Sequence, residues 1–276
     1  MSLLSQIGAA LLVTALYAAL FAAMELWRRR RPVAAEITRK GVHVGGGMIA
    51  LALPALFDTH WPVLVLGSLL TAALLAARRR SLLPAVQMVE RSTVGEILYP
   101  TAIYLAFLSS ALTAAPHRYV MAILILALGD GAAGLVGERF GRHRYRVAGG
   151  AKSLEGSATF LAVVAAIVTT TLIISVDDAP LHALLVGLVV GLVAAGIEAI
   201  STHGLDNITV TLGSWGMLAV TERRGVDELL LDLVVAVVVT GVVILLSRGR
   251  QARWVTGIVG GALLLYGVWM LAAPTA

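Results

Sequence analysis

The chain has 276 residues, of which 59% are hydrophobic and 13% are charged, and its mean hydropathy is +0.90. An average soluble domain is about half apolar and about a quarter charged, so this composition excludes an ordinary soluble globule. The absence of cysteine excludes disulfides, thiolate catalysis and cysteine metal sites. The net charge of +5 comes from short arginine clusters between apolar runs. This pattern is typical of membrane topology, and we expect no nucleic-acid partner.

Apolar runs follow one another along the whole chain. They fall at residues 3–26, 42–57, 61–77, 94–115, 119–137, 157–176, 181–200, 207–221, 229–247 and 254–273. A helix needs about 20 apolar residues to cross a bilayer, and lipid offers irregular backbone no hydrogen-bond partner. We therefore predict an all-α fold, a polytopic integral membrane helical bundle with nine or ten transmembrane helices. The count is open because the weakest run, 207–221, either spans the membrane or lies in the interface.

Arginine clusters set the expected orientation of the spans. They lie at 28–31, 78–80 and 142–146, in alternate loops. Basic loops face the cytoplasm, which places the N-terminus outside, but the rule does not orient the chain after Asn207. The first run is too long for a signal-peptide core and has no basic flank before it, so we expect a retained span. Histidines and acids on the outer side are interpreted as solvated loop residues: Asp58, His60, His117, Asp177, Asp178 and His182.

The remaining ionisable residues gather, on this topology, at the cytoplasmic ends of the spans. They come from separate parts of the chain: Arg39, Lys40, His43, Glu96, Asp130, Lys152, Glu155, Glu198 and Asp206. Charged groups at membrane depth are costly and usually face a cavity or a partner. The sequence therefore predicts one polar site at the cytoplasmic membrane face.

The segment 129–157 is the most informative part of the sequence. Small residues recur every four positions in it: Gly129, Ala133, Gly137 and Gly141. Such a stripe by itself favours close helix packing. Lys152 and Ser153 follow a glycine pair and open the next apolar run, and a helix start of this kind suits phosphate. Asp130 is expected to hold Mg²⁺ on those phosphates, although the G-x-x-x-x-G-K-[ST] loop is absent.

Other candidates have a structural interpretation beside the functional one. Arg39 and His43 lie four residues apart on one helix face, but a histidine at a membrane entrance also serves as a structural donor. Glu96 either acts in catalysis or pairs with a neighbouring arginine. Asp206 and Asn207 either belong to the site or cap the following helix.

Together, these motifs resemble those of the phytol kinase and dolichol kinase family of membrane CTP-dependent lipid kinases, which also includes a CTP-dependent diacylglycerol kinase. The resemblance covers about residues 36–215, in the family's order. It rests on Arg39-Lys40-x-x-His43-x-x-Gly46, Gly129-Asp130-x-x-Ala133-x-x-x-Gly137-x-x-x-Gly141, Lys152-Ser153-x-Glu155-Gly156-Ser157 and Glu198-x-x-Ser201-x-x-Gly204-x-Asp206-Asn207. We expect residues 1–276 to form a single membrane domain, in which residues 222–276 are additional C-terminal helices without an assigned role.

The resemblance implies transfer of the γ-phosphoryl group of CTP to the hydroxyl of a membrane isoprenoid alcohol such as phytol, geranylgeraniol, dolichol or polyprenol. The expected cofactor is Mg²⁺ or another divalent cation, held by Asp130, Glu198 and Asp206. Nucleotide and phosphate binding is assigned to Gly129, Lys152, Ser153, Gly156, Ser157 and Asn207. The catalytic candidates are Arg39, Lys40, His43, Glu96 and Glu155. Arg39 and Lys40 are expected to neutralise charge, and His43, Glu96 or Glu155 is expected to orient or deprotonate the hydroxyl.

Two other functions stay open at this point. The stretch from Lys152 to Gly156 also looks like part of the phosphatidate cytidylyltransferases, which implies a CDP-lipid synthase, although their long acidic C-terminal signature is not visible. An anion transporter also explains intramembrane charge, but it predicts polar groups that continue to the outer side. We expect a protein of a prokaryotic plasma membrane that binds CTP and a lipid alcohol. The particular alcohol and the oligomeric state are left open.

Overall fold

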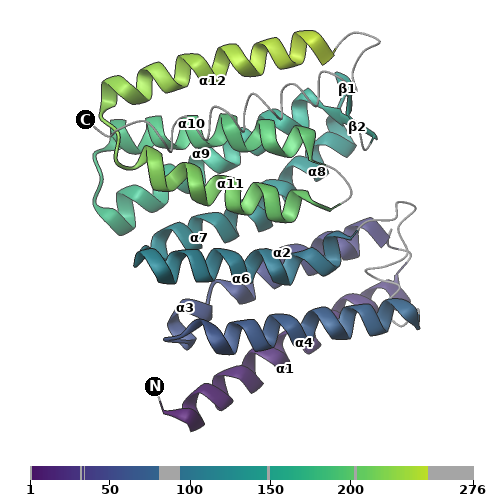
Figure 1. The fold of residues 1–276 in the computed structure, drawn as a ribbon. Helices are drawn as coiled ribbons and strands as arrows, with labels where there is room; N and C mark the ends of the chain where they lie inside the picture. Colours follow the sequence, from purple (N-terminus) through teal and green to yellow (C-terminus); the bar gives the residue numbers. More distant parts are fainter. Residues whose placement is uncertain are drawn as a thin grey trace.

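The protein is a bundle of long helices. The computed structural model describes residues 2–31, 33, 35–80, 94–147, 150–201 and 204–247, with the backbone alone for a few of them, including Glu96. The helices are α1 (Leu3–Arg30), α2 (Ala35–Ala50), α3 (Leu53–Leu56), α4 (His60–Arg79), α6 (Gly95–Thr113), α7 (Pro116–Leu124), the π-helix η1 (Ile125–Gly129), α8 (Asp130–Phe140), α9 (Leu154–Val176), α10 (Pro180–Ile200), α11 (Asp206–Thr221) and α12 (Val226–Ser247). Figure 1 shows them side by side, with α1 at one edge of the bundle and α12 at the other.

Several helices are long and apolar enough to cross a membrane. Among the described residues, five satisfy both criteria: Leu3–Arg30, His60–Arg79, Pro116–Phe140, Leu154–Val176 and Pro180–Ala199. This agrees with the predicted helical membrane bundle. The count of nine or ten spans stays a prediction, and the last apolar run, 254–273, lies outside the described residues.

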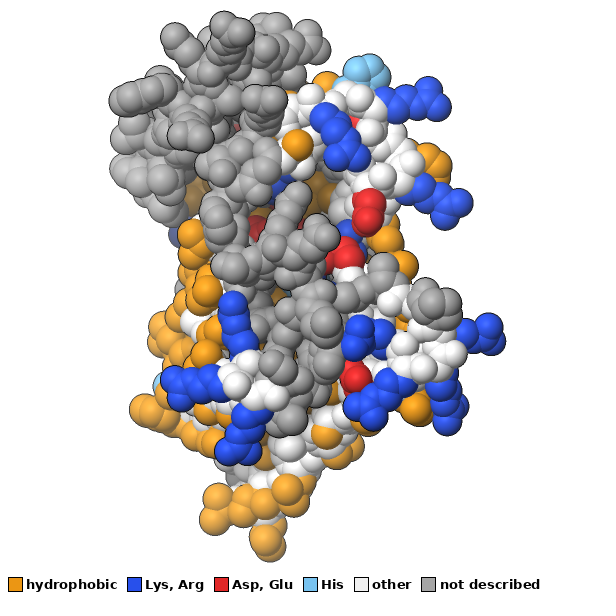
Figure 2. Space-filling model, turned by 90° about the vertical axis from the view of Figure 1, so that its right-hand side faces the viewer, with side chains coloured by type: hydrophobic (Ala, Val, Ile, Leu, Met, Phe, Trp, Pro, Cys, Tyr) orange, Lys and Arg blue, Asp and Glu red, His pale blue; other side chains and the backbone are white. Residues whose placement is uncertain are grey.

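Successive long helices run in opposite directions, so their ends collect at two faces of the bundle (Figure 1). One of them, called the basic face below, carries Arg28–Arg31, Arg78–Arg80, Arg139, Arg142 and Arg144. Figure 2 looks onto this face and shows lysine and arginine side chains spread around it, with acidic side chains between them. The opposite face carries the turns at 57–60, 114–117, 177–180 and 222–226. The predicted arginine loops therefore share one face, and its cytoplasmic orientation stays a prediction.

The weakest apolar run forms α11, which packs inside the bundle against α10 and α6. Its buried residues include Asn207, Thr211, Ser214 and Thr221. The hydroxyls of Thr211 and Thr221 donate to the carbonyl four residues earlier, at 2.5 and 2.8 Å. Such local bonds satisfy buried hydroxyls without a second helix. The structure thus favours a bundle helix over an interfacial one.

A short hairpin precedes α9 and was not predicted. Strands β1 (Arg144–Val147) and β2 (Gly150–Ser153) pair antiparallel, with Tyr145 opposite Lys152. A helix start at Lys152 and Ser153 was predicted here, because the glycine pair at 149–150 hides the strand pattern; Lys152 lies instead in β2 and the helix begins at Leu154. The Tyr145 hydroxyl lies 2.7 Å from Ser157 Oγ in α9. Burial raises the pKa of Tyr145 to about 12, so the neutral phenol ties the hairpin to the helix.

The small-residue stripe of α8 packs against the start of α9. A Cβ added at Gly137 would lie 3.0 Å from Ser153 Oγ and 3.5 Å from Gly156 Cα, and one at Gly129 would lie 3.1 Å from Phe160. Close approach of two backbones is what small residues allow in membrane helices. The packing interpretation of the stripe is confirmed, and nucleotide binding at Gly129 stays a prediction.

The buried core has two parts, which meet along α7. One part contains side chains of α9, α10, α11 and α12, together with Met121 and Ile125. The other contains side chains of α1, α2 and α6, together with Tyr119 and Ile123. Between helices in lipid, such contacts stabilise the fold through close van der Waals packing. Because α7 and η1 contribute side chains to both parts of the core, they fix the position of the following helix, α8.

Two further glycines set the packing of α10 on α9. A Cβ added at Gly187 would lie 2.6 Å from Thr169 Oγ1 and 2.8 Å from the Ala165 carbonyl oxygen, and one at Gly191 would lie 3.1 Å from the Leu161 carbonyl oxygen. These glycines are four residues apart and face the same helix. They form a GxxxG contact that the sequence analysis did not single out.

We predict that Gly187→Ala lowers the thermal stability of the purified protein in detergent. The added methyl group meets a backbone oxygen that cannot move aside, and overpacking of this kind costs about 1–3 kcal/mol. In the control Gly216→Ala, the added Cβ meets nothing within 4 Å, so the midpoint is unchanged or slightly raised. Thermal unfolding followed by circular dichroism checks this. Equal midpoints for the two variants would contradict the packing account.

Candidate active site

Charged side chains from five elements meet just inside the basic face. They are Arg39 and His43 on α2, Asp130 at the start of α8, Lys152 on β2, Glu198 near the end of α10 and Asp206 at the start of α11. Asp130 interacts electrostatically with Arg39, Glu198 and Asp206. Lys152 interacts with both Glu198 and Asp206. The structure thus brings together six residues that the sequence analysis assigned to one site, and we call them the charged cluster.

Asp130 and His43 face each other where α8 begins. Asp130 directly follows η1, a π-helical turn of a kind that is frequent at functional sites. His43 Nε2 lies 3.8 Å from Asp130 Oδ2 and 2.9 Å from the Leu126 carbonyl oxygen of η1. Because a carbonyl oxygen only accepts, the hydrogen bond to Leu126 assigns the ring proton to Nε2. The Asp130 side chain remains 31% exposed, so its carboxylate is accessible to a ligand.

Lys152 and Glu198 form a nearly buried ion pair. Lys152 Nζ donates to Glu198 Oε1 at 2.6 Å and also to the Glu198 main-chain carbonyl. Glu198 is 8% exposed, and a carboxylate this buried is costly without a partner. The pair joins a residue predicted to bind phosphate to a residue predicted to bind metal. A phosphate at Lys152 therefore competes with the Glu198 carboxylate.

The turn before α11 rests on the start of α6. Gly204 has a φ of +89°, and a Cβ there would overlap the backbone of Gly95. Asn207 is 8% exposed and donates from Nδ2 to the Gly95 carbonyl oxygen at 2.7 Å. Asp206 Oδ1 accepts from the Asn207 N–H at 3.1 Å. Asn207 thus ties α11 to α6, and the Asp206 carboxylate is held at the charged cluster.

Arg39 and Lys40 enter the site from the start of α2. Arg39 donates to both carboxylate oxygens of Glu36, at 2.9 and 2.5 Å. This bidentate pair fixes the guanidinium, and the sequence analysis did not single out Glu36. The Lys40 side chain packs over Gly134 of α8, where a Cβ would overlap its Nζ. Both cations therefore lie beside the helix that carries Asp130.

The residues at the start of α9 have structural partners. Ser153 caps the helix by accepting from the Gly156 N–H at 3.1 Å. Glu155 accepts from the His143 N–H at 3.2 Å and lies 2.7 Å from its Nδ1. These contacts hold the turn before β1, so the Glu155 carboxylate is occupied there. Roles for Ser153, Glu155, Gly156 and Ser157 in the reaction stay predictions. The Glu96 side chain and Gly149 lie outside the described residues.

The charged cluster suits a divalent cation that also binds substrate phosphates. Within the described part of the chain, no three His, Asp or Glu side chains lie close enough to hold an ion by themselves. Mg²⁺ at phosphoryl-transfer sites uses one or two carboxylates and completes its shell with phosphates and water. Asp130 and Asp206 interact as like charges, which a cation between phosphates and carboxylates would relieve. Glu198 is less suited, because Lys152 already pairs with it.

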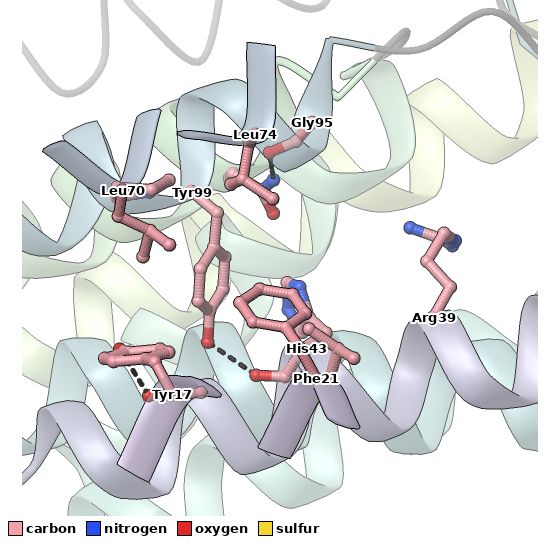
Figure 3. A pocket seen from close by; sticks show the side chains of 12 residues that line it. Tyr17, Phe21, Arg39, His43, Leu70, Leu74, Gly95 and Tyr99 are labelled. Atoms are coloured by element: carbon pink, nitrogen blue, oxygen red, sulfur yellow. Dashed lines mark hydrogen bonds between the residues drawn. The ribbon is translucent and has the colours of Figure 1, made fainter. Parts of the chain in front are cut away.

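A pocket opens beside the charged cluster. It lies between α1, α2, α4 and α6, with Asn207 of α11 at one corner, and its space of about 560 Å³ includes a part that is open to the outside. Arg39 and His43 line it as well, so these residues belong to both the pocket and the cluster. Figure 3 shows Arg39 toward one end and Leu70 toward the other, with His43 between them. A polar site and an apolar cavity therefore share a wall.

Tyrosine hydroxyls hold α2 in place, which the sequence analysis missed. Tyr17 donates to the Gly46 carbonyl at 2.9 Å, Tyr99 to the His43 carbonyl at 2.6 Å and Tyr119 to the Ala50 carbonyl at 2.8 Å. A tyrosine in an apolar run needs a hydrogen-bond partner. This requirement is the sequence signal from which such bonds could have been expected. The partners themselves depend on the packing of distant helices.

Ion pairs at the opposite face correct one sequence interpretation. Arg118, which is 8% exposed, donates to Glu222 Oε2 from Nε at 3.0 Å, and His117 Nε2 lies 3.0 Å from the same oxygen. His182 Nδ1 lies 2.6 Å from Asp178 Oδ2. His117, Asp178 and His182 are therefore not solvated loop residues. That interpretation was wrong because His117 pairs with Glu222 on another turn, and His182 pairs with Asp178 one helical turn away. These pairs allow the side chains to be partly buried.

We predict that Lys152→Met strongly destabilises the protein, because it leaves Glu198 charged and almost buried without a partner. Breaking a buried pair in this way costs about 3–5 kcal/mol. Adding Glu198→Leu to the same chain should recover most of the lost stability, since apolar residues of similar volume often replace such a pair at little cost. Thermal unfolding of the single and double variants measures both effects. An equal loss in the two variants would show that the ion pair does not control stability.

Comparisons with known proteins show the family of the chain. No protein-family model matches the chain, and no solved structure matches it. Phytol kinase from Synechocystis sp. is 37% identical over 194 residues, which cover 69% of this chain and 81% of that protein. Similarity at this level over most of both chains shows common descent. The chain therefore belongs to the phytol and polyprenol kinase family.

Proposed function

We propose that this protein is a CTP-dependent kinase that transfers the γ-phosphoryl group to the hydroxyl of a membrane isoprenoid alcohol at the cytoplasmic membrane face. Membership of the family supports the reaction class, because the relative is named a phytol kinase. The observation that carries the proposal is the shared wall between the charged cluster and the apolar pocket, formed by Arg39 and His43. Such a wall supports a reaction between a polar donor and a lipid acceptor.

The arrangement suits phosphoryl transfer physically. This reaction needs little covalent chemistry from the protein, so positioning and charge neutralisation dominate catalysis. A triphosphate is hydrophilic and arrives from the aqueous side, whereas an isoprenoid tail stays among apolar side chains. Arginine clusters at the basic face favour the cytoplasmic side by the positive-inside rule. The membrane of a prokaryote would then present the site to cytoplasmic CTP.

Each part of the charged cluster has a proposed role. Lys152, with the backbone near Ser153 and Gly156, binds phosphate oxygens after leaving Glu198, and Asn207 contributes at the edge of the pocket. When bound at Asp130 and Asp206, Mg²⁺ supplies charge neutralisation for the phosphates. Arg39 and Lys40 neutralise charge on the transferred group from the α2 side.

A CDP-lipid synthase remains the second enzymatic candidate, since it would also use CTP beside a lipid pocket. Product analysis distinguishes the two reactions. The kinase releases CDP, whereas a cytidylyltransferase releases pyrophosphate.

An anion transporter receives less support from the structure. In the described part of α7 and η1, Tyr119, Met121, Ile123 and Ile125 each have 0% exposure. These side chains lie between the charged cluster and the ion pairs of the opposite face. A transport path needs polar groups along its length. Of these four side chains only Tyr119 carries a polar group, and its hydroxyl is bonded to the Ala50 carbonyl.

We predict that Asp130→Asn lowers kcat for CTP-dependent phosphorylation by about 10²–10³-fold, because the amide removes the charge that faces the metal–phosphate complex. Purified wild-type and variant proteins are incubated with γ-labelled CTP and a prenol, and label is counted in the organic phase. The control Glu138→Gln makes the same chemical change at an exposed position of the same helix and should retain the wild-type rate. A near-wild-type rate for Asp130→Asn would overturn the metal assignment.

A further inference from the structure

The pocket runs along the helix axes, inward from the basic face. Arg39, His43 and Gly46 line it on α2, and Leu74 and Leu70 line it on α4. Because a helix rises 1.5 Å per residue, the inner end lies roughly 6–10 Å deeper than the outer end. The outer end is polar at the arginine, and the inner part is apolar. A ligand with a polar head group and an apolar tail fits a pocket with a polar outer end and an apolar inner part.

The apolar part of the pocket lies near the edge of the bundle. Phe21 of α1 and Leu70 and Leu74 of α4 form its apolar wall. Figure 1 shows α1 and α4 at the edge opposite α12, and only 11% and 17% of their apolar windows are buried. The apolar wall of the pocket is therefore formed by two helices that lie at the outside of the bundle.

His43 stands at the boundary between the pocket and the charged cluster. Its Nε2 donates to the Leu126 carbonyl at 2.9 Å, so in the neutral ring the lone pair is on Nδ1. The Tyr99 ring packs on the imidazole at 4.4 Å, and the Tyr99 hydroxyl donates to the His43 carbonyl at 2.6 Å. The ring is thus held in one orientation by its neighbours (Figure 3). Nδ1 is thus the ring atom that can accept a hydrogen bond from a hydroxyl in the pocket that His43 lines.

We propose that this pocket binds the acceptor alcohol, with its tail along Phe21, Leu70 and Leu74 and its hydroxyl at His43 Nδ1. The alcohol oxygen forms a bond to the γ-phosphorus, and its proton passes to His43 Nδ1. The bond from the γ-phosphorus to the bridging oxygen breaks, and the nucleoside diphosphate leaves with that electron pair. The imidazolium then returns the proton to water. This inference rests on the proposed function, because it places the acceptor and the base of that reaction.

The tail site is tested by a pair of tryptophan substitutions on α4. Leu70→Trp fills the pocket, whereas Leu69→Trp adds the same bulk at a side chain that is 62% exposed and does not line the pocket. With geranylgeraniol as the probe, Leu70→Trp should lower kcat/KM for the alcohol at least about tenfold, as the loss of a well-filled apolar contact implies. The KM for CTP should stay unchanged, and Leu69→Trp should behave as wild type. Equal effects of the two substitutions would overturn the pocket assignment.

The base is tested with His43→Gln, whose side-chain N–H can still donate to the Leu126 carbonyl but whose amide accepts no proton. We expect kcat to fall about 10²–10⁴-fold while the KM values and the thermal midpoint stay near those of the wild type. In His43→Ala, added imidazole should restore part of the rate. A His43→Gln enzyme with a near-wild-type kcat would overturn the base assignment. A wild-type protein that phosphorylates no alcohol would instead overturn the proposed function itself, so the two failures are distinguishable.

Discussion

Charge that lies at the end of an apolar bundle has to be compensated locally, and the site depends on this constraint. Glu198 is almost buried and is held by Lys152 at 2.6 Å, which joins the end of α10 to β2. Asp130 and Asp206 repel each other and are offset by Arg39 from α2. Because most of these charges interact with groups on other elements, they help to specify how α2, α8, α10 and α11 meet. Under the proposed function, a phosphate at Lys152 and a cation at Asp130 and Asp206 would take the place of some of these contacts.

At the same end of the bundle, the charged cluster and the apolar pocket lie next to each other. His43 contacts the charged cluster through Nε2 and lines the pocket with the rest of its ring. The π-helical turn supplies the carbonyl that fixes this ring, and Tyr99 holds its backbone. A reaction between a nucleotide and a membrane lipid requires such a boundary, because the nucleotide does not dissolve in lipid and the lipid tail does not dissolve in water. The boundary here consists of few side chains, each with a defined partner.

Much of this architecture could be predicted from the sequence, and the exceptions have physical reasons. Arginine spacing and apolar runs indicated a helical bundle with charges from distant segments at one face, since both signals are local and periodic. The hairpin was missed because a glycine pair interrupts its strand pattern, and the Gly187 contact was missed because it depends on the packing of two different helices. The five-residue π-helix lies inside an apolar run that has no local signal for it. Pairing of Lys152 with Glu198, and of Glu155 with His143, also could not be predicted. Residue type predicts that a carboxylate needs a partner but does not say which partner it finds.

The central claim is that the γ-phosphoryl group of CTP, and no other part of the nucleotide, reaches the lipid. The most direct measurement incubates purified wild-type protein and a prenol with CTP labelled either at the γ-phosphate or at the α-phosphate. The account predicts label in the organic phase from γ-labelled CTP alone, together with release of CDP. Label in the organic phase from α-labelled CTP would identify a cytidylyl transfer, and no label from either nucleotide would contradict the proposed activity.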